Sequence, residues 1–114
     1  MAVRAICNNP QQLLGQLKAA IRAGTVKTWQ LDQDGDLTHS PEQWRGKAWF
    51  RPSVETGVLV FKILGRQSVA MTTEVYAVYH GRLIEMLLAH FDDKFTSAVA
   101  TAQAVYGEYI APGS

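Results

Sequence analysis

Two apolar runs around Gly81 dominate the pattern of hydrophobic and polar positions along the chain. Residues 69–79 and 82–91 are rich in β-branched and aromatic side chains, and Gly81 between them can adopt the positive φ that tight turns require. If His80-Gly81 is a two-residue turn, side-chain alternation makes one face of the paired strands almost wholly apolar. The pattern therefore predicts one long β-hairpin over residues 69–91, around which the rest of the chain is organised.

The second face of this predicted hairpin mixes large apolar groups with carboxylates. Cross-strand pairing puts Tyr76 opposite Glu85, and it puts Glu74 two positions further along the same face. Unpaired carboxylates are unfavourable in a dry core, and a broad apolar surface is unfavourable in water. We therefore expect another surface to cover part of this face. A slip of one residue in the pairing would exchange the two faces.

The remaining segments alternate between helical and strand patterns. Apolar side chains recur at three- and four-residue spacing over residues 10–23, and Asn9 and Pro10 suit the start of a helix. Pro52 lacks a backbone N–H, so it should end the preceding strand or confine it to an edge of the sheet. The other expected elements are an edge strand or arm over 1–7, strands over 25–32, 36–39, 47–51 and 58–64, a helical turn over 40–46, and a last helix from Asp92 or Asp93 to Tyr106.

This order of elements predicts a single α+β domain over residues 1–111. The sheet should be mostly antiparallel with five or six strands, and an N-terminal and a C-terminal helix should pack on one of its faces. Residues 112–114, Pro-Gly-Ser, are expected to form a flexible end. A chain of 114 residues can bury enough surface to fold without a disulfide or a metal ion.

Charge and cysteine content narrow the function classes. The 11 basic and 10 acidic residues give a net charge of +1 and are scattered, so we expect no nucleic-acid partner. No apolar stretch of about 18 residues is present, so we expect no membrane partner either. The single cysteine, Cys7, cannot form an internal disulfide, which favours a reducing, cytoplasmic location.

Two sequence features resemble a calcium-binding loop and a reactive cysteine, but the full pattern supports neither site. Asp32, Asp34 and Asp36 alternate as calcium ligands do, but Leu37 and Gln43 stand where an EF-hand loop needs Gly and Glu. An ordinary hairpin turn is the better interpretation, and no metal site is expected. Cys7 precedes a helix N-terminus, which can activate a thiol, yet a buried structural thiol is the better interpretation. Glycine-rich phosphate loops and the G-x-S-x-G motif are absent, so we expect no cofactor.

Six residues remain as candidates for a site. They are Trp44, Trp49, Arg51, Glu74, Tyr76 and Glu85.

The carboxylates of Glu74 and Glu85, beside Tyr76, could have their pKa values split as acid–base work requires, or they could be solvated sheet residues paired with Lys or Arg. The first hypothesis is a non-enzymatic domain that uses its exposed sheet face for homodimerisation or for a protein partner. The alternative is a small-molecule site in which Arg51 fixes an anion between the aromatic residues. Whether the protein is an enzyme stays open at this point.

Overall fold

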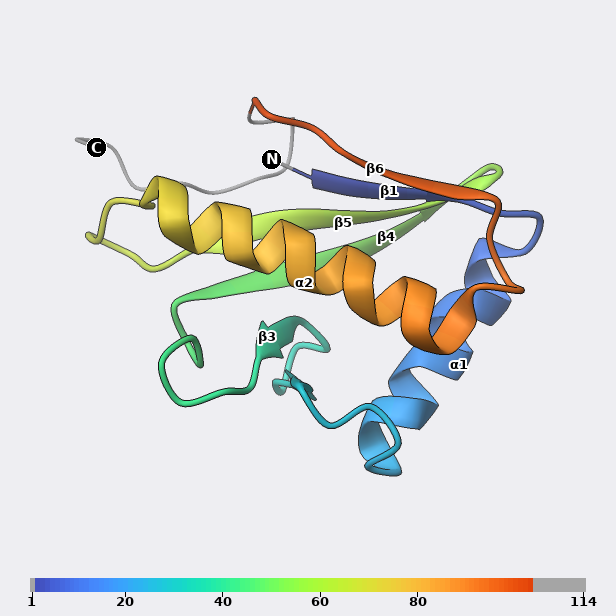
Figure 1. The fold of residues 1–114 in the computed structure, drawn as a ribbon, viewed down its shortest axis with the longest axis horizontal. Coiled ribbons are helices and arrows are strands. Elements are labelled where there is room, and N and C mark those ends of the chain that lie inside the picture. Colours follow the sequence, from blue (N-terminus) through green and yellow to red (C-terminus); the bar gives the residue numbers. More distant parts are fainter. Residues whose placement is uncertain (1, 104–114) are drawn as a thin grey trace.

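A six-stranded antiparallel sheet runs through the computed structural model, which describes residues 2–103 (Figure 1). The strands are β1 (Ala2–Ile6), β2 (Trp29–Leu31), β3 (Leu37–His39), β4 (Ala48–Glu55), β5 (Val58–Gly65) and β6 (Ser97–Ala100), and the helices are α1 (Pro10–Arg22) and α2 (Thr73–Phe91). The strand order is β2-β3-β4-β5-β1-β6. This confirms the predicted α+β fold with a mostly antiparallel sheet and two helices.

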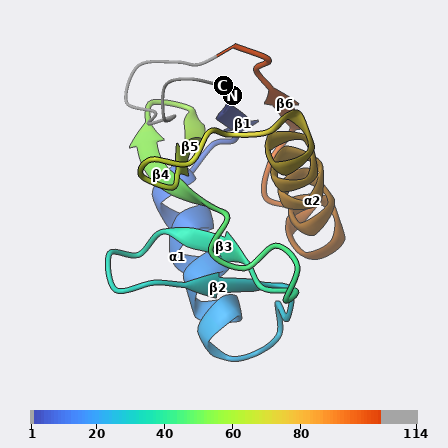
Figure 2. The same ribbon diagram turned by 90° about the vertical axis from the view of Figure 1, so that its left-hand side faces the viewer.

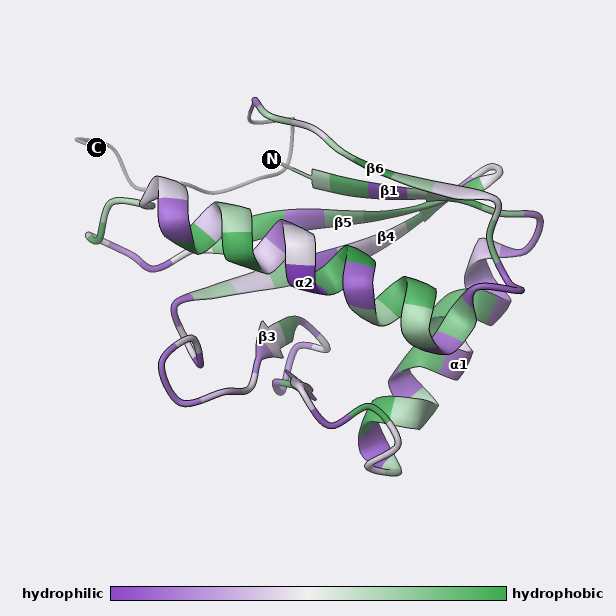
Figure 3. Ribbon diagram, viewed as in Figure 1, coloured by the Kyte–Doolittle hydropathy of each residue, from purple (hydrophilic) through white to green (hydrophobic). Residues whose placement is uncertain are grey.

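Both helices pack on the same face of the sheet. Leu13 and Leu17 of α1 and Tyr79 and Leu83 of α2 share one hydrophobic core with Phe61 of β5. Figure 2 shows the sheet curving from β6 down to β2, with α2 lying across its open side. Figure 3 colours the central strands β1 and β5 mostly as hydrophobic, as their position in this core requires. The opposite face carries a smaller buried cluster and is covered by neither helix.

The predicted N-terminal helix and first hairpin are confirmed. The side chain of Asn9 accepts a hydrogen bond from the backbone N–H of Gln12 at 3.0 Å, and Pro10 occupies the first turn of α1. β2 and β3 pair across the Asp34-Gly35 turn, where Gly35 has a φ of 82°. Such a positive φ favours glycine, so the glycine at this position allowed the turn to be predicted from the sequence.

The hairpin predicted over residues 69–91 is wrong, because residues 73–91 form α2 instead. The side chain of Thr72 accepts from the backbone N–H of Val75 at 3.1 Å and starts the helix. The buried side chains then recur mostly at three- and four-residue spacing, and they are Val75, Tyr79, His80, Leu83, Met86, Leu87 and Phe91.

The same residues are β-branched, aromatic and aliphatic, which are types common in strands. Over short stretches the apolar and polar side chains also alternate, so the segment resembled a strand. The helical stripe is the pattern that faces the core.

Gly81 separates the two interpretations experimentally. It lies inside α2 without a positive φ, and a Cβ added there would meet no atom within 4 Å. Gly81→Ala should therefore raise the free energy of unfolding by about 0.5–1 kcal/mol, because alanine loses less backbone freedom in a helix. Urea unfolding measures the change. A marked loss of stability would instead indicate the turn conformation of a hairpin.

The predicted last helix is also wrong within the described residues. Asp92 ends α2, and residues 97–100 form β6, which pairs with β1. Ala98 and Ala100 face the core side beside Ala5 and Val3, so small residues at alternate positions fit a strand here. The expected ends of that helix at 104–106 and of the chain at 112–114 lie outside the described residues.

Two strand placements need correction. β1 was expected at an edge or as an arm, but it lies between β5 and β6. The strand expected over 47–51 continues through Pro52 to Glu55. Pro52 is tolerated because β3 is short and pairs with β4 only at Leu37 and Phe50, which leaves Pro52 with β5 as its neighbour.

Candidate functional site

β6 forms an edge of the sheet, and its outer side pairs with no strand of the described chain. The backbone N–H of Thr101 donates to the carbonyl of Ala2 at 2.8 Å, in register with the β1–β6 ladder. Bonded positions alternate along an antiparallel strand, so Val99 turns its backbone N–H and C=O toward β1. Ala98 and Ala100 consequently turn theirs outward, away from the sheet.

This edge lacks the features that usually protect edge strands. Residues 95–103 contain no charged side chain, no proline and no glycine. Edge strands are normally protected from pairing by lysine, proline or a bulge. Val99 is 51% exposed and Ile6 on the neighbouring strand is 42% exposed, both on the face that the helices leave open. β6 is thus an uncharged edge beside an exposed apolar surface.

Two of the predicted site residues, Trp44 and Glu85, line one pocket. It has a volume of about 240 Å³ and lies between α2 and the turn that follows β3. His39 and Arg82 line the same pocket, and Arg82 Nη1 lies 3.1 Å from Glu85 Oε2. This ion pair is exposed and follows the helical i, i+3 spacing, so its contribution to stability is small. The pocket combines an aromatic wall with charges of both signs.

His39 is the buried titratable group of this pocket. Its Nδ1 lies 2.8 Å from the carbonyl oxygen of Thr28, so Nδ1 carries a proton and donates it. The imidazole also packs against Trp29, with ring centroids 4.8 Å apart and the ring planes tilted by 43°. Burial lowers the pKa of His39, and the Thr28 carbonyl opposes this effect. At neutral pH the ring is therefore uncharged, and its Nε2 is an acceptor.

The lowered pKa of His39 has a consequence for stability. An unfolded histidine titrates near 6.5, so on acidification through about pH 6.5 the unfolded chain takes up this proton before the folded protein does. The free energy of unfolding should therefore fall between pH 7.5 and pH 5.5. Urea unfolding at both values should show a smaller fall in His39→Gln than in the wild type. Equal falls in the two proteins would contradict this assignment.

Trp49 and Arg51 lie elsewhere, on the open face of β4. Arg51 Nε and Nη2 donate to the two carboxylate oxygens of Asp36 at 3.1 and 2.8 Å. This bidentate contact raises the pKa of Arg51, and the carboxylate of Asp36 is 5% exposed. A pocket of about 320 Å³ adjoins the pair. Two N–H groups of Arg51 are thus already bound to Asp36, which makes Arg51 less suitable for binding an anion.

The acidic group of the β2–β3 turn has the contacts of a turn. Asp32 Oδ1 accepts from the backbone N–H groups of Asp34 and Asp36, both at 2.9 Å. Carboxylate oxygens of all three residues lie within 4.8 Å of one another. Arg51 supplies the positive charge at Asp36, so the local geometry supports the turn interpretation.

Tyr76 and Glu85 do not meet, because nine residues make about two and a half turns of helix and place them on opposite sides of α2. Glu74 lies in the first turn of α2 and is exposed. Tyr76 lines an apolar groove of about 320 Å³ between α2 and the end of β6. His80 lines it too, and its Nδ1 donates to the carbonyl oxygen of Tyr76. The predicted acid–base constellation is therefore not formed.

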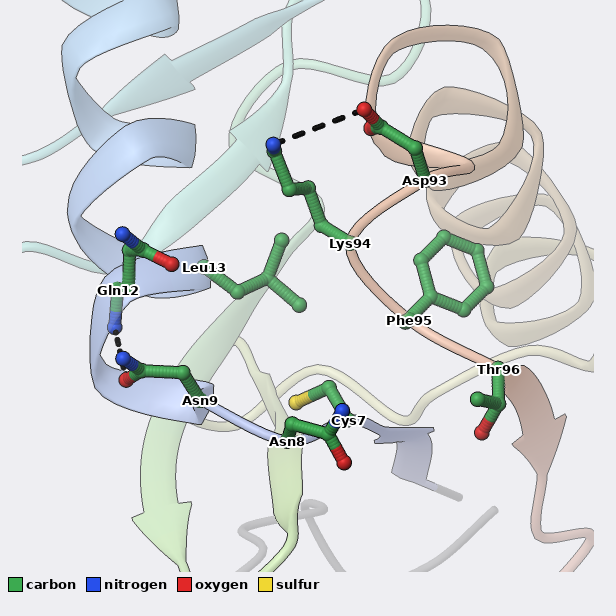
Figure 4. A pocket seen from close by; sticks show the side chains of 9 residues that line it. All are labelled: Cys7, Asn8, Asn9, Gln12, Leu13, Asp93, Lys94, Phe95 and Thr96. Atoms are coloured by element: carbon green, nitrogen blue, oxygen red, sulfur yellow. Dashed lines mark hydrogen bonds and ion pairs between the residues drawn. The ribbon is translucent and has the colours of Figure 1, made fainter.

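Cys7 lines a pocket of about 220 Å³ between the start of α1 and the segment after α2 (Figure 4). Lys94 in this pocket forms an ion pair with Asp93 at 3.6 Å. Burial raises the pKa of the Cys7 thiol, and no histidine of the described chain lines the pocket. These conditions favour an unreactive thiol over a nucleophile.

The reactivity of Cys7 can be measured directly. In the native protein at pH 8, a thiol reagent such as 5,5′-dithiobis(2-nitrobenzoic acid) should modify Cys7 at least about 100-fold more slowly than in the protein unfolded by urea, because the thiol is buried and protonated. Absorbance of the released thiolate follows the reaction. Equal rates would show an accessible, activated cysteine.

The six candidates predicted from the sequence thus lie in four separate places, with Trp44 beside Glu85, Trp49 beside Arg51, and Tyr76 and Glu74 each apart from the others. Trp44 and Glu85 share a pocket with His39 and Arg82, which were not predicted. The burial of His39 follows from its place in β3, opposite Trp29. The predicted first hairpin already placed His39 in a strand, but it did not indicate that the imidazole ring lines a pocket. The free edge of β6 was hidden because its segment was expected to be helical.

These features define a small antiparallel α+β domain with a free strand edge and shallow pockets. No helix within residues 2–103 is both long and apolar enough to cross a membrane. No protein-family model matches the chain, and searches of curated proteins and of solved structures gave no match.

Proposed function

We propose that the protein is a small, cytoplasmic, non-enzymatic interaction domain that forms a homodimer through the β6 side of its sheet. The unprotected edge strand carries this proposal. The outward N–H and C=O groups of Ala98 and Ala100 need hydrogen-bond partners, and the edge strand of another chain supplies them in a fixed geometry. The sheet face with Ile6 and Val99 adds exposed apolar surface next to that edge. The buried, protonated Cys7 thiol fits a reducing compartment.

Hydrogen exchange at two protein concentrations tests this proposal. If chains pair through β6, the outward amides of Ala98 and Ala100 should exchange at least about 10-fold more slowly at millimolar than at micromolar protein, because pairing gives them hydrogen-bond acceptors. The short strand β2 at the opposite edge of the sheet is the internal control and should not change. Exchange in β6 that is independent of concentration would contradict the proposal.

A second candidate function is the binding of a small anionic molecule in the pocket of Trp44 and Glu85. The pocket brings Arg82 beside the neutral His39. The guanidinium of Arg82 can donate hydrogen bonds to a ligand carboxylate, and Nε2 of His39 can accept one from a ligand hydroxyl. This function replaces the predicted site around Arg51, whose donors bind Asp36.

Thermal unfolding with millimolar acetate, succinate and inorganic phosphate tests the second candidate. A ligand at 100 times its dissociation constant should stabilise the protein by about 2.7 kcal/mol. Arg82→Gln should abolish the stabilisation, whereas Arg66→Gln, which alters an arginine outside this pocket, should retain it. Unchanged melting temperatures with all three anions would remove this candidate.

A further inference from the structure

We infer that the partner of β6 is the β6 strand of a second copy, paired antiparallel about a two-fold axis at Val99. This inference rests on the proposed homodimer and specifies its geometry. In this arrangement Ala98 of one chain lies opposite Ala100 of the other, and Val99 lies opposite its own copy. The two sheets would join into one continuous antiparallel sheet.

The direction of the backbone groups selects this register. Ala98 and Ala100 are the two residues of β6 whose N–H and C=O point outward, as the Thr101–Ala2 bond and the β1–β6 ladder establish. A two-fold axis at Val99 brings Ala98 opposite the partner's Ala100. Each such pair exchanges two hydrogen bonds, so the two pairs satisfy all the outward groups of the strand. A strand of four residues gains its full set of bonds only in this register.

The composition of the segment favours an identical partner. Residues 95–103 carry no charge, so two copies meet without like-charge repulsion. A non-identical partner would leave Val99 against an unspecified side chain, whereas two-fold pairing sets Val99 against Val99 at a position without cross-strand hydrogen bonds. Side chains approach most closely at such positions, and β-branched pairs are favourable there.

On the helix side of the edge, a groove lies between α2 and the end of β6. The side chains of Ala98 and Ala100 lie on the core side of the sheet, and the same would hold for the incoming copy. The neighbouring groove of α2 presents Ala77 and Gly81, both exposed, and a Cβ built on Gly81 meets no atom within 4 Å. The groove beside Ala100 is thus bordered in part by small, exposed residues of α2, and the Ala98 methyl group of the second copy would lie on this side, opposite Ala100.

Disulfide trapping tests the register. Val99→Cys places two thiols across the two-fold axis, at the Cα separation of about 4.5 Å that non-bonded antiparallel pairs have, which lies within the range for a disulfide. Ile6→Cys is the matched control, because Ile6 lies on the same face with similar exposure. Its two copies would be three strand spacings apart, about 14 Å, which no disulfide spans. The buried Cys7 is common to both variants and to the wild type.

Under mild oxidation, Val99→Cys should convert almost fully to a covalent dimer on non-reducing gels, and Ile6→Cys should remain a monomer there. Cross-linking of Ile6→Cys alone would show sheets stacked face to face, which overturns this register while the homodimer stands. No cross-linking of either variant, with a dimeric wild type in solution, would also overturn it. A monomeric wild type would overturn both the register and the proposed homodimer.

Discussion

Replacing Leu83 by alanine is expected to lower the free energy of unfolding by about 2–5 kcal/mol, the range for a fully buried leucine. Leu83 is 0% exposed and lies in the core stripe of α2. Truncation removes contacts with that core and leaves a cavity, because the sheet and the helices can close it only in part. Urea unfolding at a protein concentration below that of self-association measures the change.

Leu88→Ala is the matched control on the same helix. Leu88 is 54% exposed, so its truncation should change stability by no more than about 0.5 kcal/mol. A hairpin over residues 69–91 would reverse this ranking, since its pairing sets Leu88 on the wholly apolar face and Leu83 on the mixed face. A larger loss in Leu88→Ala than in Leu83→Ala would therefore contradict the helical assignment of α2.

Val99→Lys is expected to weaken self-association by on the order of 100-fold or more. The substitution places an ammonium group on each side of the two-fold axis, where the two like charges oppose each other directly. It also gives the edge the lysine that protected edge strands commonly carry. Val99 is 51% exposed and lies opposite Arg4 of β1, so the added ammonium group should cost the monomer no more than about 1 kcal/mol and leave its buried core intact. Sedimentation velocity over a range of concentrations measures the dissociation constant.

Val54→Lys provides the control for a general effect of added charge. Val54 is 41% exposed, and it lies on β4, three strands away from β6. This variant should associate like the wild type, with a melting temperature close to that of Val99→Lys. Equal weakening in both variants would place the interface elsewhere or show a non-specific effect of charge.

The parts of the fold that the sequence predicted are those with local chemical signals. α1 has an asparagine cap and an early proline, and the β2–β3 turn has a glycine with positive φ. The α+β class followed from the balance of helical and strand patterns. These signals act over a few residues, so no knowledge of the tertiary contacts was needed.

α2 was mistaken because its sequence satisfies two periodicities at once. Tyr79 and Leu83 belong to a helical stripe, yet the run around them also alternates well enough for a strand. The shape of the sheet decides between the helix and the hairpin, because its concave face is filled by a helix and would not be filled by a further hairpin. That shape cannot be read from the sequence pattern. β6 was mistaken for part of a helix because Asp92 or Asp93 suits a helix start and apolar side chains recur at helical spacing from Phe95 to Val105.

The candidate site was predicted only in part, because it depends on how α2 packs against the sheet. Trp44 was predicted from the composition of its segment and Glu85 from the expected strand pairing. The two residues share a pocket, but the pairing that was to join Glu85 to Tyr76 does not exist. His39 and Arg82 come together only when α2 packs beside β3. The unprotected edge could be recognised once the segment over 97–100 was known to be a strand with β1 on one side alone.

Light scattering coupled to size-exclusion chromatography, from micromolar to millimolar wild-type protein, tests the proposed homodimer most directly. We expect a mass that rises with concentration to twice the chain mass of 12.6 kDa and no further, because a two-fold pairing of β6 leaves that edge with no unpaired strand. A constant mass of one chain across that range would contradict it.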